Sequence, residues 1–319
     1  MRNVRTRWRG TAALAAVVSL LLGTGEVAAA SAPRTPPVAK GIGVSVEIEK
    51  LPAFIARTGT RPEVYSVFTS WSEKKLFDVR TADTARAQGM RTSVTWEPWN
   101  PRGDMRTQPR YALKRIAQGS FDGYVRAYAR SVKRYRHPVT IRFAHEMNGS
   151  WYPWGVTNGN RPADYRAAWR HVHHMFRAEH VTNVTWEWSP NVLFYGSPGL
   201  RPFYPGDRFV DQIGLSGYNW GQSSTTRWQS FTQIYDVSLR SLRTIAPTKR
   251  IWLSEVASAA PGGDRAAWVA DLFRQVRSRP YIAGLVWFNR RVPVRNWLLE
   301  VDPRVLSEWR RQARRGLRP

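Results

Sequence analysis

Eight short runs of apolar, β-branched and aromatic residues recur along the sequence, and segments with helical periodicity separate them. The expected strands are residues 42–48, 64–71, 90–96, 139–145, 181–188, 210–217, 250–255 and 282–288. The expected helices are residues 52–57, 81–88, 121–135, 163–179, 228–245, 264–277 and 304–314. Apolar strands that alternate with amphipathic helices predict an α/β fold with a parallel sheet. Eight such units in about 280 residues favour a single-domain (β/α)8 TIM barrel over a doubly wound sheet.

One connection departs from this alternation. Between the fifth and sixth expected strands, residues 196–207 contain three Pro and three Gly, so we expect mostly loop there. The chain has no Cys, so its stability must come from an apolar core and not from disulfides. The same absence removes thiol catalysis and Cys-ligated metal sites from the candidate functions.

Residues 1–30 have the composition of a secretory signal peptide. Four Arg precede an apolar run at 11–22, and Ala28 to Ala30 provide an Ala-x-Ala cleavage site. A membrane anchor is the alternative, but the run is shorter than the roughly 20 residues that span a bilayer. Residues 31–40 are rich in Pro and Ala and predict a flexible spacer. We therefore expect a secreted, extracellular protein whose catalytic domain comprises residues 41–319.

The chain is strongly basic. Its formal net charge is +26, of which +23 lies beyond Ala30. Such an excess favours association with polyanions. The basic residues are scattered through every segment and are not gathered into one helix or tail, as a nucleic-acid footprint would be. We therefore expect no specific nucleic-acid partner, but a non-specific association with anionic cell-wall polymers; an Arg-rich composition without a dedicated partner is the alternative.

Unusual polar and aromatic residues gather where the expected strands end. They are Trp96 and Glu97 after the third strand, His145 and Glu146 after the fourth, Asn191 after the fifth, Tyr218 after the sixth, Glu255 after the seventh and Trp287 in the eighth. Active sites of TIM barrels lie at the C-terminal ends of the strands. The clustering therefore predicts a functional site on this rim.

The segment at residues 142–155 has the make-up of a sugar-cleaving site. It combines the carboxyl group of Glu146 with the polar side chains of His145 and Asn148, and the aromatic rings of Trp151 and Tyr152 follow. A glycosidase needs an acid to protonate the leaving oxygen, polar groups for hydroxyls and aromatic faces for sugar rings. The alternative is a buried structural network around the glutamate.

Two glutamates are placed to work as a pair. In a barrel, Glu146 and Glu255 would face each other across the mouth, and a carboxyl pair roughly 5 to 5.5 Å apart is the arrangement for retaining glycoside hydrolysis. Glu146 would act as the acid and then the base, while Glu255 would attack the anomeric carbon. Their surroundings must keep Glu146 protonated and Glu255 charged.

Several motifs in the expected order resemble glycoside hydrolase family 26, the endo-β-1,4-mannanase-like family. They are RFAHEMNGSWYPWG, FYPGDRFVDQIGLSGYNW, IWLSEVAS and IAGLVWFNRRVPVRNW, with further similarity in WEPW, AWRHVHHMF and WEWSPN. The resemblance implies a TIM-barrel hydrolase with Glu146 as acid/base and Glu255 as nucleophile. It implies a substrate-binding set of Arg142, His145, Trp151, Tyr218 and Trp287, to which Trp96 and Asn191 are added as rim residues. His145 occupies the position where many related barrel glycosidases carry Asn.

Two departures from the family pattern leave the carboxylates intact. The chain has Ser216 where members usually have Asp, and Asn296 where they usually have Asp before a Trp. Both changes are expected to affect which sugar is accepted. The basic residues Arg290, Arg291 and Arg295 would suit a charged or substituted polymer, although a solvated basic loop is the plainer interpretation.

We expect neither a metal nor another cofactor. His171, His173 and His174 lie together in one expected helix, far in sequence from any partner carboxylate, whereas metal sites usually draw ligands from several elements. The sequence therefore predicts a monomeric, retaining endo-glycosidase acting on polysaccharide, with β-1,4-mannan as the first substrate. The alternatives are the same chemistry on mixed-linkage glucan, xylan or an exopolysaccharide, and a carbohydrate-binding barrel without catalysis.

Overall fold

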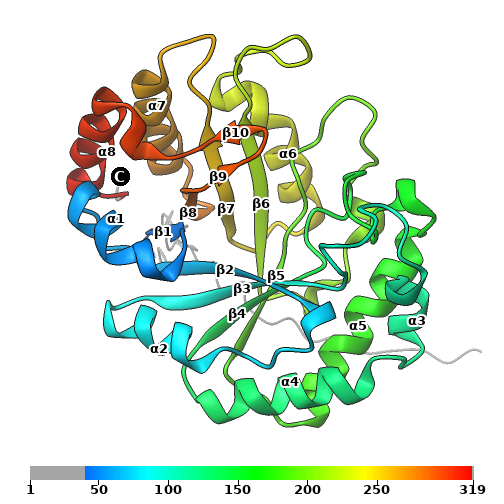
Figure 1. Ribbon diagram of the computed structural model, residues 1–319. Helices are drawn as coiled ribbons and strands as arrows, with labels where there is room; N and C mark the ends of the chain where they lie inside the picture. The colour runs from blue at the N-terminus through cyan, green and yellow to red at the C-terminus, as the bar shows by residue number, and fades with distance from the viewer. Residues whose placement is uncertain (1–39, 318–319) are drawn as a thin grey trace, which may run out of the picture. The chain divides into compact units, whose positions relative to one another are not determined.

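A computed structural model describes residues 40–317, apart from the side chain of Thr157. The expected signal peptide and almost all of the expected spacer lie outside the described residues. Eight parallel strands close into a barrel in sequence order, which confirms the predicted TIM barrel (Figure 1). The strands are β1 Gly41–Ser45, β2 Val64–Ser70, β3 Arg91–Glu97, β4 Val139–Phe143, β5 Val184–Trp188, β6 Gln212–Asn219, β7 Ile251–Ser258 and β8 Ile282–Phe288.

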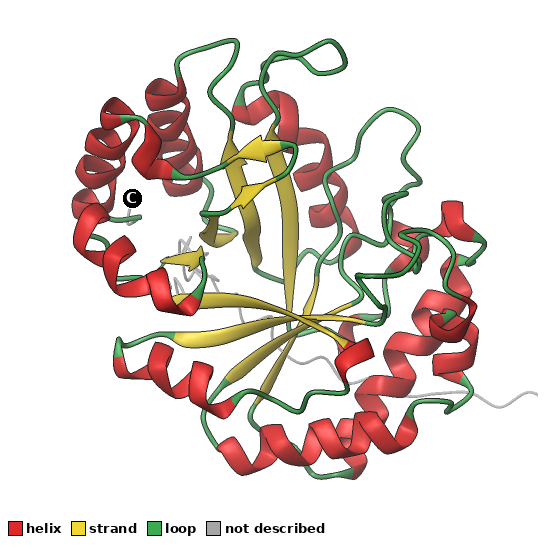
Figure 2. Ribbon diagram, in the orientation of Figure 1, coloured by secondary structure: helices red, strands yellow, loops and turns green. Residues whose placement is uncertain are grey.

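Helices surround the barrel, as Figure 2 shows. They are α1 Leu51–Thr58, α2 Val79–Ala87, α3 Leu113–Ala117, α4 Asp122–Tyr135, α5 Pro162–Ala178, α6 Phe231–Ile245, α7 Arg265–Ser278 and α8 Pro303–Arg315. Between β5 and β6 the chain forms only the short 3-10 turns Arg201–Phe203 and Asp207–Phe209, so the predicted loop is confirmed. Among residues 40–317, no helix is long and apolar enough to cross a membrane.

Local sequence explains where the helices begin and which face they bury. In α4, Val125, Tyr128 and Val132 repeat at helical spacing and are all buried against the barrel. At the start of α6, Ser230 accepts a hydrogen bond from the Gln233 backbone N–H, and the Gln233 side chain accepts one from the Ser230 N–H. Such reciprocal capping satisfies two backbone donors that a helix otherwise leaves unpaired.

Two elements were not predicted. The five-residue helix α3 lies in the connection between β3 and α4. A two-stranded antiparallel hairpin, β9 Arg291–Val292 and β10 Arg295–Asn296, follows β8. The hairpin forms part of the wall of the barrel mouth, since Val292 and Val294 line the cavity described below.

The strand β7 contains an irregularity that shapes the site. Gly214 pairs with Trp252, but Ser216 pairs with Glu255, so β7 has one residue more than β6 over this stretch. The pairing of β7 with β8 shifts at the same place. Successive side chains of a regular strand point to opposite faces. The extra residue allows Ser254 and Glu255 to turn their side chains to the same side, the barrel interior, where both make the contacts given below.

Candidate active site

A cavity of about 940 Å³ opens at the C-terminal ends of the strands. Its walls include Glu146, Trp151, Asn191, Tyr218 and Glu255. These residues follow or end β4, β5, β6 and β7, which is the rim where the sequence places the site. Arg142 and His145 do not face the cavity directly; both are buried behind Glu255.

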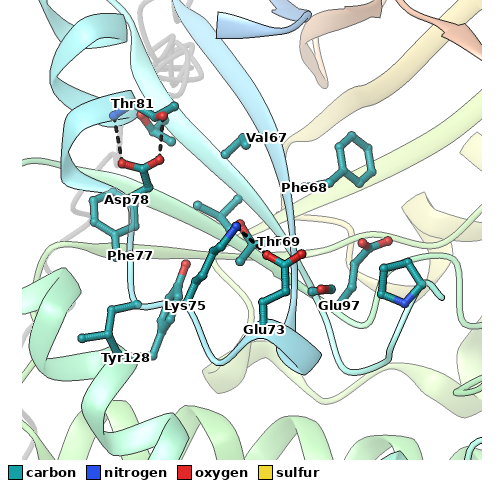
Figure 3. Close-up of a pocket in the computed structure, with 15 residues that line it drawn as sticks. Val67, Phe68, Thr69, Glu73, Lys75, Phe77, Asp78, Thr81, Glu97 and Tyr128 are labelled. Carbon is teal, nitrogen blue, oxygen red and sulfur yellow. Dashed lines mark hydrogen bonds and ion pairs between the residues drawn. The ribbon is translucent and has the colours of Figure 1, made fainter. Parts of the chain in front are cut away.

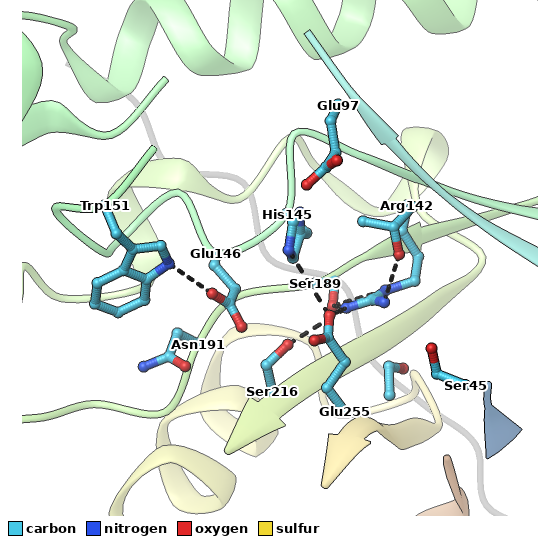
Figure 4. Close-up of polar contacts among 12 residues, drawn as sticks. Ser45, Glu97, Arg142, His145, Glu146, Trp151, Ser189, Asn191, Ser216 and Glu255 are labelled. Carbon is cyan, nitrogen blue, oxygen red and sulfur yellow. Dashed lines mark hydrogen bonds and ion pairs between the residues drawn. The ribbon is translucent and has the colours of Figure 1, made fainter. Parts of the chain in front are cut away.

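Glu255 is held by a cation and a phenol. Arg142 Nη2 donates a hydrogen bond to Glu255 Oε1 at 2.9 Å (Figure 4). The Tyr218 hydroxyl donates one to Oε2 at 2.6 Å. Burial, together with the nearby carboxylates, raises the pKa of Tyr218 well above its usual range, so the phenol keeps its proton. Both partners stabilise the negative charge of Glu255.

Glu146 lies in a different setting. The indole of Trp151 donates a hydrogen bond to Glu146 Oε2 at 2.7 Å (Figure 4). Burial, reinforced by the negative charge of Glu255, raises the pKa of Glu146 to about 8. Glu146 therefore holds its proton at neutral pH and is able to act as an acid.

The turn that carries Glu146 is strained. Both Ala144 and Glu146 have positive φ angles, 46° and 52°, which side chains other than glycine rarely adopt. The Glu146 backbone N–H donates a hydrogen bond of 2.7 Å to the Ser189 carbonyl. The Asn148 side-chain amide donates to the Asn191 carbonyl and accepts from the Asn191 N–H. These contacts hold Glu146 in a backbone conformation that would be unfavourable without them.

His145, Glu146 and Glu255 each place one side-chain N or O atom within 4.8 Å of the others. Such a spacing would also suit a metal ion, but Arg142 already sets a fixed positive charge 2.9 Å from Glu255, and it opposes a second cation. Burial and the charge of Arg142 lower the pKa of His145 well below its usual range, so the imidazole is neutral. One carboxyl oxygen of Glu146 lies within 4.8 Å of one carboxyl oxygen of Glu255.

Trp96 and Trp287, which the sequence places in the sugar site, lie outside the cavity. Trp96 is fully buried and stacks on Tyr128 of α4, with ring centroids 4.3 Å apart. Trp287 is also buried, and its indole donates to the Trp297 carbonyl. Both indoles point outward from the barrel. Because successive side chains of a strand alternate between its two faces, the residues that follow them, Glu97 and Phe288, point inward.

The rings that do line the cavity come mainly from loops. Trp220 and Trp297 lie on the Tyr218 side, with the Tyr218 and Trp297 ring centroids 5.1 Å apart. Phe194 and Tyr195 lie on the Trp151 side, and the Trp151 and Phe194 centroids are 5.7 Å apart. Phe194, Tyr195 and Trp297 were not among the residues that the sequence placed in the site. Their aromatic character was visible, but the loop conformations that bring them to the cavity were not.

A second, smaller cavity of about 380 Å³ lies beside β2 and β3 (Figure 3). Glu97 lines this cavity, and burial raises the pKa of Glu97 to about 8. Among the described residues, the only hydrogen bond to the Glu97 side chain is a long one of 3.4 Å from the Trp99 indole. Elsewhere in this cavity Lys75 pairs with Glu73, and both side chains are well exposed to solvent.

An eight-stranded parallel barrel with two close carboxyl groups at its mouth is the arrangement of barrel glycoside hydrolases. Residues 106–259 match the profile of glycosyl hydrolase family 26. Endoglucanase H of Acetivibrio thermocellus is 31% identical over 276 residues, which cover 84% of this chain and 29% of that protein. The chain belongs to glycosyl hydrolase family 26, as the sequence motifs predict.

Further comparisons agree. A mannan endo-1,4-β-mannosidase of Bifidobacterium adolescentis is 29% identical over 157 residues, which cover 46% of this chain and 15% of that protein. The chain thus spans less than a third of the length of both curated relatives. A structure of an endo-β-1,4-mannanase double mutant from Cellulomonas fimi superimposes with a TM-score of 0.69 at 18% identity, covering 88% of this chain and 72% of that one. At this identity the likeness shows the shared fold.

Proposed function

We propose that the protein is a retaining endo-glycosidase that hydrolyses a β-linked polysaccharide, with Glu146 as acid/base and Glu255 as nucleophile. One observation carries this proposal: two carboxyl groups within 4.8 Å of each other have opposite surroundings. Glu146 is kept neutral by burial, whereas Glu255 receives hydrogen bonds from Arg142 and Tyr218. A non-catalytic sugar-binding barrel would have no need for this asymmetry, since buried carboxyl groups cost free energy.

In the first step, Glu255 attacks the anomeric carbon while Glu146 gives its proton to the glycosidic oxygen. The bond between that carbon and the leaving sugar breaks, and a covalent glycosyl ester on Glu255 forms. Burial of Glu146 persists, but esterification removes the negative charge of Glu255 that also raises the pKa of Glu146. The carboxylate that Glu146 becomes on giving up its proton is therefore more stable, and it serves as the base of the second step. It then takes a proton from water, which attacks the same carbon and releases Glu255.

β-1,4-Mannan is the first candidate substrate, because family relatives named as mannan endo-1,4-β-mannosidases match this chain. β-Glucan is the second candidate. A specific observation favours it, since the match with endoglucanase H extends over 84% of the chain while the match with the Bifidobacterium mannosidase extends over 46%. Ser216 is buried beside Arg142, and Asn296 directly precedes Trp297, which lines the cavity; both departures are expected to influence this choice.

We also propose that the protein is exported, acts as a monomer and associates non-specifically with anionic cell-wall polymers. The support is the leader-like composition of residues 1–30 and the net charge of +26. A salt-dependent retention on anionic cell-wall material that is lost above about 0.5 M salt would agree with a purely electrostatic association.

The first experiment measures reducing-sugar release from galactomannan, glucomannan, mixed-linkage glucan and xylan by the purified full chain. Glu255→Ala serves as the blank, and Glu49→Ala, which removes an exposed carboxylate that does not line the cavity, is the matched control. If the wild type and Glu49→Ala cleave only the mannans, and Glu255→Ala cleaves none of the four polysaccharides, the mannanase proposal is supported. Cleavage of only the mixed-linkage glucan would support the second candidate. Proton NMR of the first product should show the β anomer; an α anomer, or full activity in Glu255→Ala, would overturn the proposed mechanism.

A further inference from the structure

A third buried glutamate lies inside the barrel, beneath the proposed catalytic pair. Glu187 is the fourth residue of β5 and is only 3% exposed. It does not line the cavity, so substrate does not contact it. The steps proposed above make no use of it.

Side chains from three other strands converge on the Glu187 carboxylate. Ser254 Oγ donates to Oε1 at 2.5 Å, and Gln212 Nε2 donates to Oε2 at 2.5 Å. Arg142 Nε lies 3.2 Å from Oε1. Every oxygen of this carboxylate therefore has a defined partner, as a buried charge requires.

The surrounding backbone leaves room for this carboxylate. At Gly214 of β6, a Cβ atom would overlap Glu187 Oε1 and the Ser189 side chain. In β7, the extra residue described above turns Ser254 toward Glu187 while Glu255 still reaches the cavity. Two neighbouring strands thus depart from their regular composition or register where they meet Glu187.

Glu187 and Glu255 share one guanidinium. Arg142 contacts Glu187 through Nε and Glu255 through Nη2. Its Nη1 donates to Thr95 Oγ1 at 2.7 Å, and Ser189 Oγ accepts from Nε and Nη2. Burial alone would lower the pKa of Arg142, but the two carboxylates outweigh burial and raise that pKa, so the guanidinium stays charged.

We infer that Glu187 is a positioning residue of the catalytic centre, which orients Arg142 toward Glu255 and takes a share of the guanidinium charge. This inference rests on the proposed function, since it concerns the nucleophile of that reaction. With two carboxylates on one cation, Glu255 is neutralised only in part and keeps the electron density that a nucleophile needs. The geometry fixes the guanidinium from both ends, so it does not rotate away when Glu255 forms its ester.

The sign of the expected effect follows from the charges around both glutamates. Glu187 is faced by Arg142 of β4, by the neutral partners on β6 and β7, and at longer range by Arg91 of β3. Glu255 is faced by Arg142, by the Tyr218 hydroxyl, by neutral His145 and by the carboxyl groups of Glu146 and Glu97. If the Glu187 charge is removed, the whole Arg142 charge acts on Glu255, which then stays ionised to lower pH and attacks more weakly.

The test is Glu187→Gln, which keeps the volume of the side chain and removes its charge. The pH profile of kcat/KM is recorded on the polysaccharide, among the four tested above, that the protein cleaves. We expect the acid limb to move to lower pH by about half to one unit. The kcat should fall roughly tenfold, because a loosened guanidinium positions Glu255 less well, while KM changes little. Glu63→Gln is the matched control, since Glu63 also acts on Arg91 but is exposed and does not contact Arg142.

Glu187→Asp separates charge from shape and also serves if the Gln variant fails to fold. It keeps the charge but withdraws the carboxylate from Arg142, so the acid limb should move in the same direction by a smaller amount while kcat falls. An acid limb that stays in place in both variants, with only a lower melting temperature, would overturn the inference and leave Glu187 as a core residue.

A carbon NMR titration keeps this result separate from the substrate proposal. In protein labelled at the glutamate carboxyl carbons, the Glu255 signal is assigned by its loss in Glu255→Gln. Its midpoint should move to lower pH in Glu187→Gln even if no tested glycan is cleaved. If no glycan is cleaved but the NMR midpoint moves, only the proposed activity is refuted. If the NMR midpoint stays unchanged, the coupling of Glu187 to Glu255 is refuted.

Discussion

The two sides of the cavity treat negative charge in opposite ways. On the Glu255 side, the Arg142 guanidinium and the Tyr218 hydroxyl both stabilise a carboxylate. On the Glu146 side, the Trp151 indole is a neutral donor, and burial favours the protonated form. The two carboxyl groups have the same chemistry and are neighbours in space. The different roles that we propose for them therefore follow from the position of Arg142, whose buried guanidinium contacts Glu255 and not Glu146.

The largest effect should come from removing the acid. We expect Glu146→Ala to lose about 10² to 10⁴ in rate on polysaccharide, because the leaving oxygen then departs without a proton. With a dinitrophenyl β-glycoside of the accepted sugar, which needs no such proton, azide should restore turnover and give the β-glycosyl azide. Chromatography and NMR of the product measure both outcomes.

The same assay on Glu255→Ala provides the contrast between the two sides. Azide would then enter the space of the missing nucleophile and give the α-glycosyl azide. If Glu146→Ala and Glu255→Ala gave the same anomer, the two sides of the cavity would not have the separate roles proposed for them.

A smaller effect is expected from Trp151→Phe, which makes the Glu146 side still less favourable to charge. In the wild type, Glu146 is protonated below its pKa of about 8, so kcat/KM should fall as the pH rises through that value. Loss of the indole N–H removes a hydrogen bond that lowers the pKa of Glu146, so the alkaline fall should move to higher pH. We expect about a tenfold lower rate at neutral pH from the loss of orientation, measured in the same pH series.

Trp99→Phe is the matched control for this change. It removes an indole donor from Glu97 at 3.4 Å and leaves the hydrogen bond between Trp151 and Glu146 in place. An alkaline limb that moved equally in both variants would show that the effect is general and not specific to Glu146.

The smallest effect is expected from Glu97→Gln, which changes the stability of the folded chain; Glu97 lines the second cavity. Glu97 has a pKa of about 8 in the folded chain against 4.5 for an ordinary glutamate. A raised pKa means that the protonated form fits the fold, so its contribution to stability is complete below about pH 4.5 and is lost as the pH rises through 8. Glu97→Gln mimics the protonated form and should raise stability at pH 8 by about 1 to 3 kcal/mol, with little change at pH 4.

Thermal unfolding at both pH values measures this difference. The exposed residue Glu49 offers the control, because Glu49→Gln removes a carboxyl group that is not buried. Equal melting temperatures of Glu97→Gln and wild type at pH 8 would contradict the burial argument.

The barrel was predictable because its signal is repeated eight times. The pair Glu146 and Glu255 was predictable too, since both stand at strand ends that a closed barrel must bring together. Trp96 and Trp287 were misplaced by a single residue, because sequence alone does not say which face of a strand a large ring occupies where both faces are buried.

The Glu187 contacts were beyond sequence reasoning for a different reason. In a strand of regular register, Ser254 and Glu255 would point to opposite faces. Only the pairing of β7 with its neighbours reveals the extra residue that brings both side chains inward. The resemblance to family 26 located Arg142 but carried no information on its second carboxylate partner.

The extra residue in β7 also bears on how such a site could arise or be lost. No single substitution converts a regular strand into one that points two consecutive side chains inward; that step requires an inserted residue. Conversely, a deletion of one residue at this place would turn either the nucleophile or the serine beneath it toward the helices, and no side-chain replacement would restore the arrangement. The length of this half of β7 is thus a constraint that is separate from the identity of its residues.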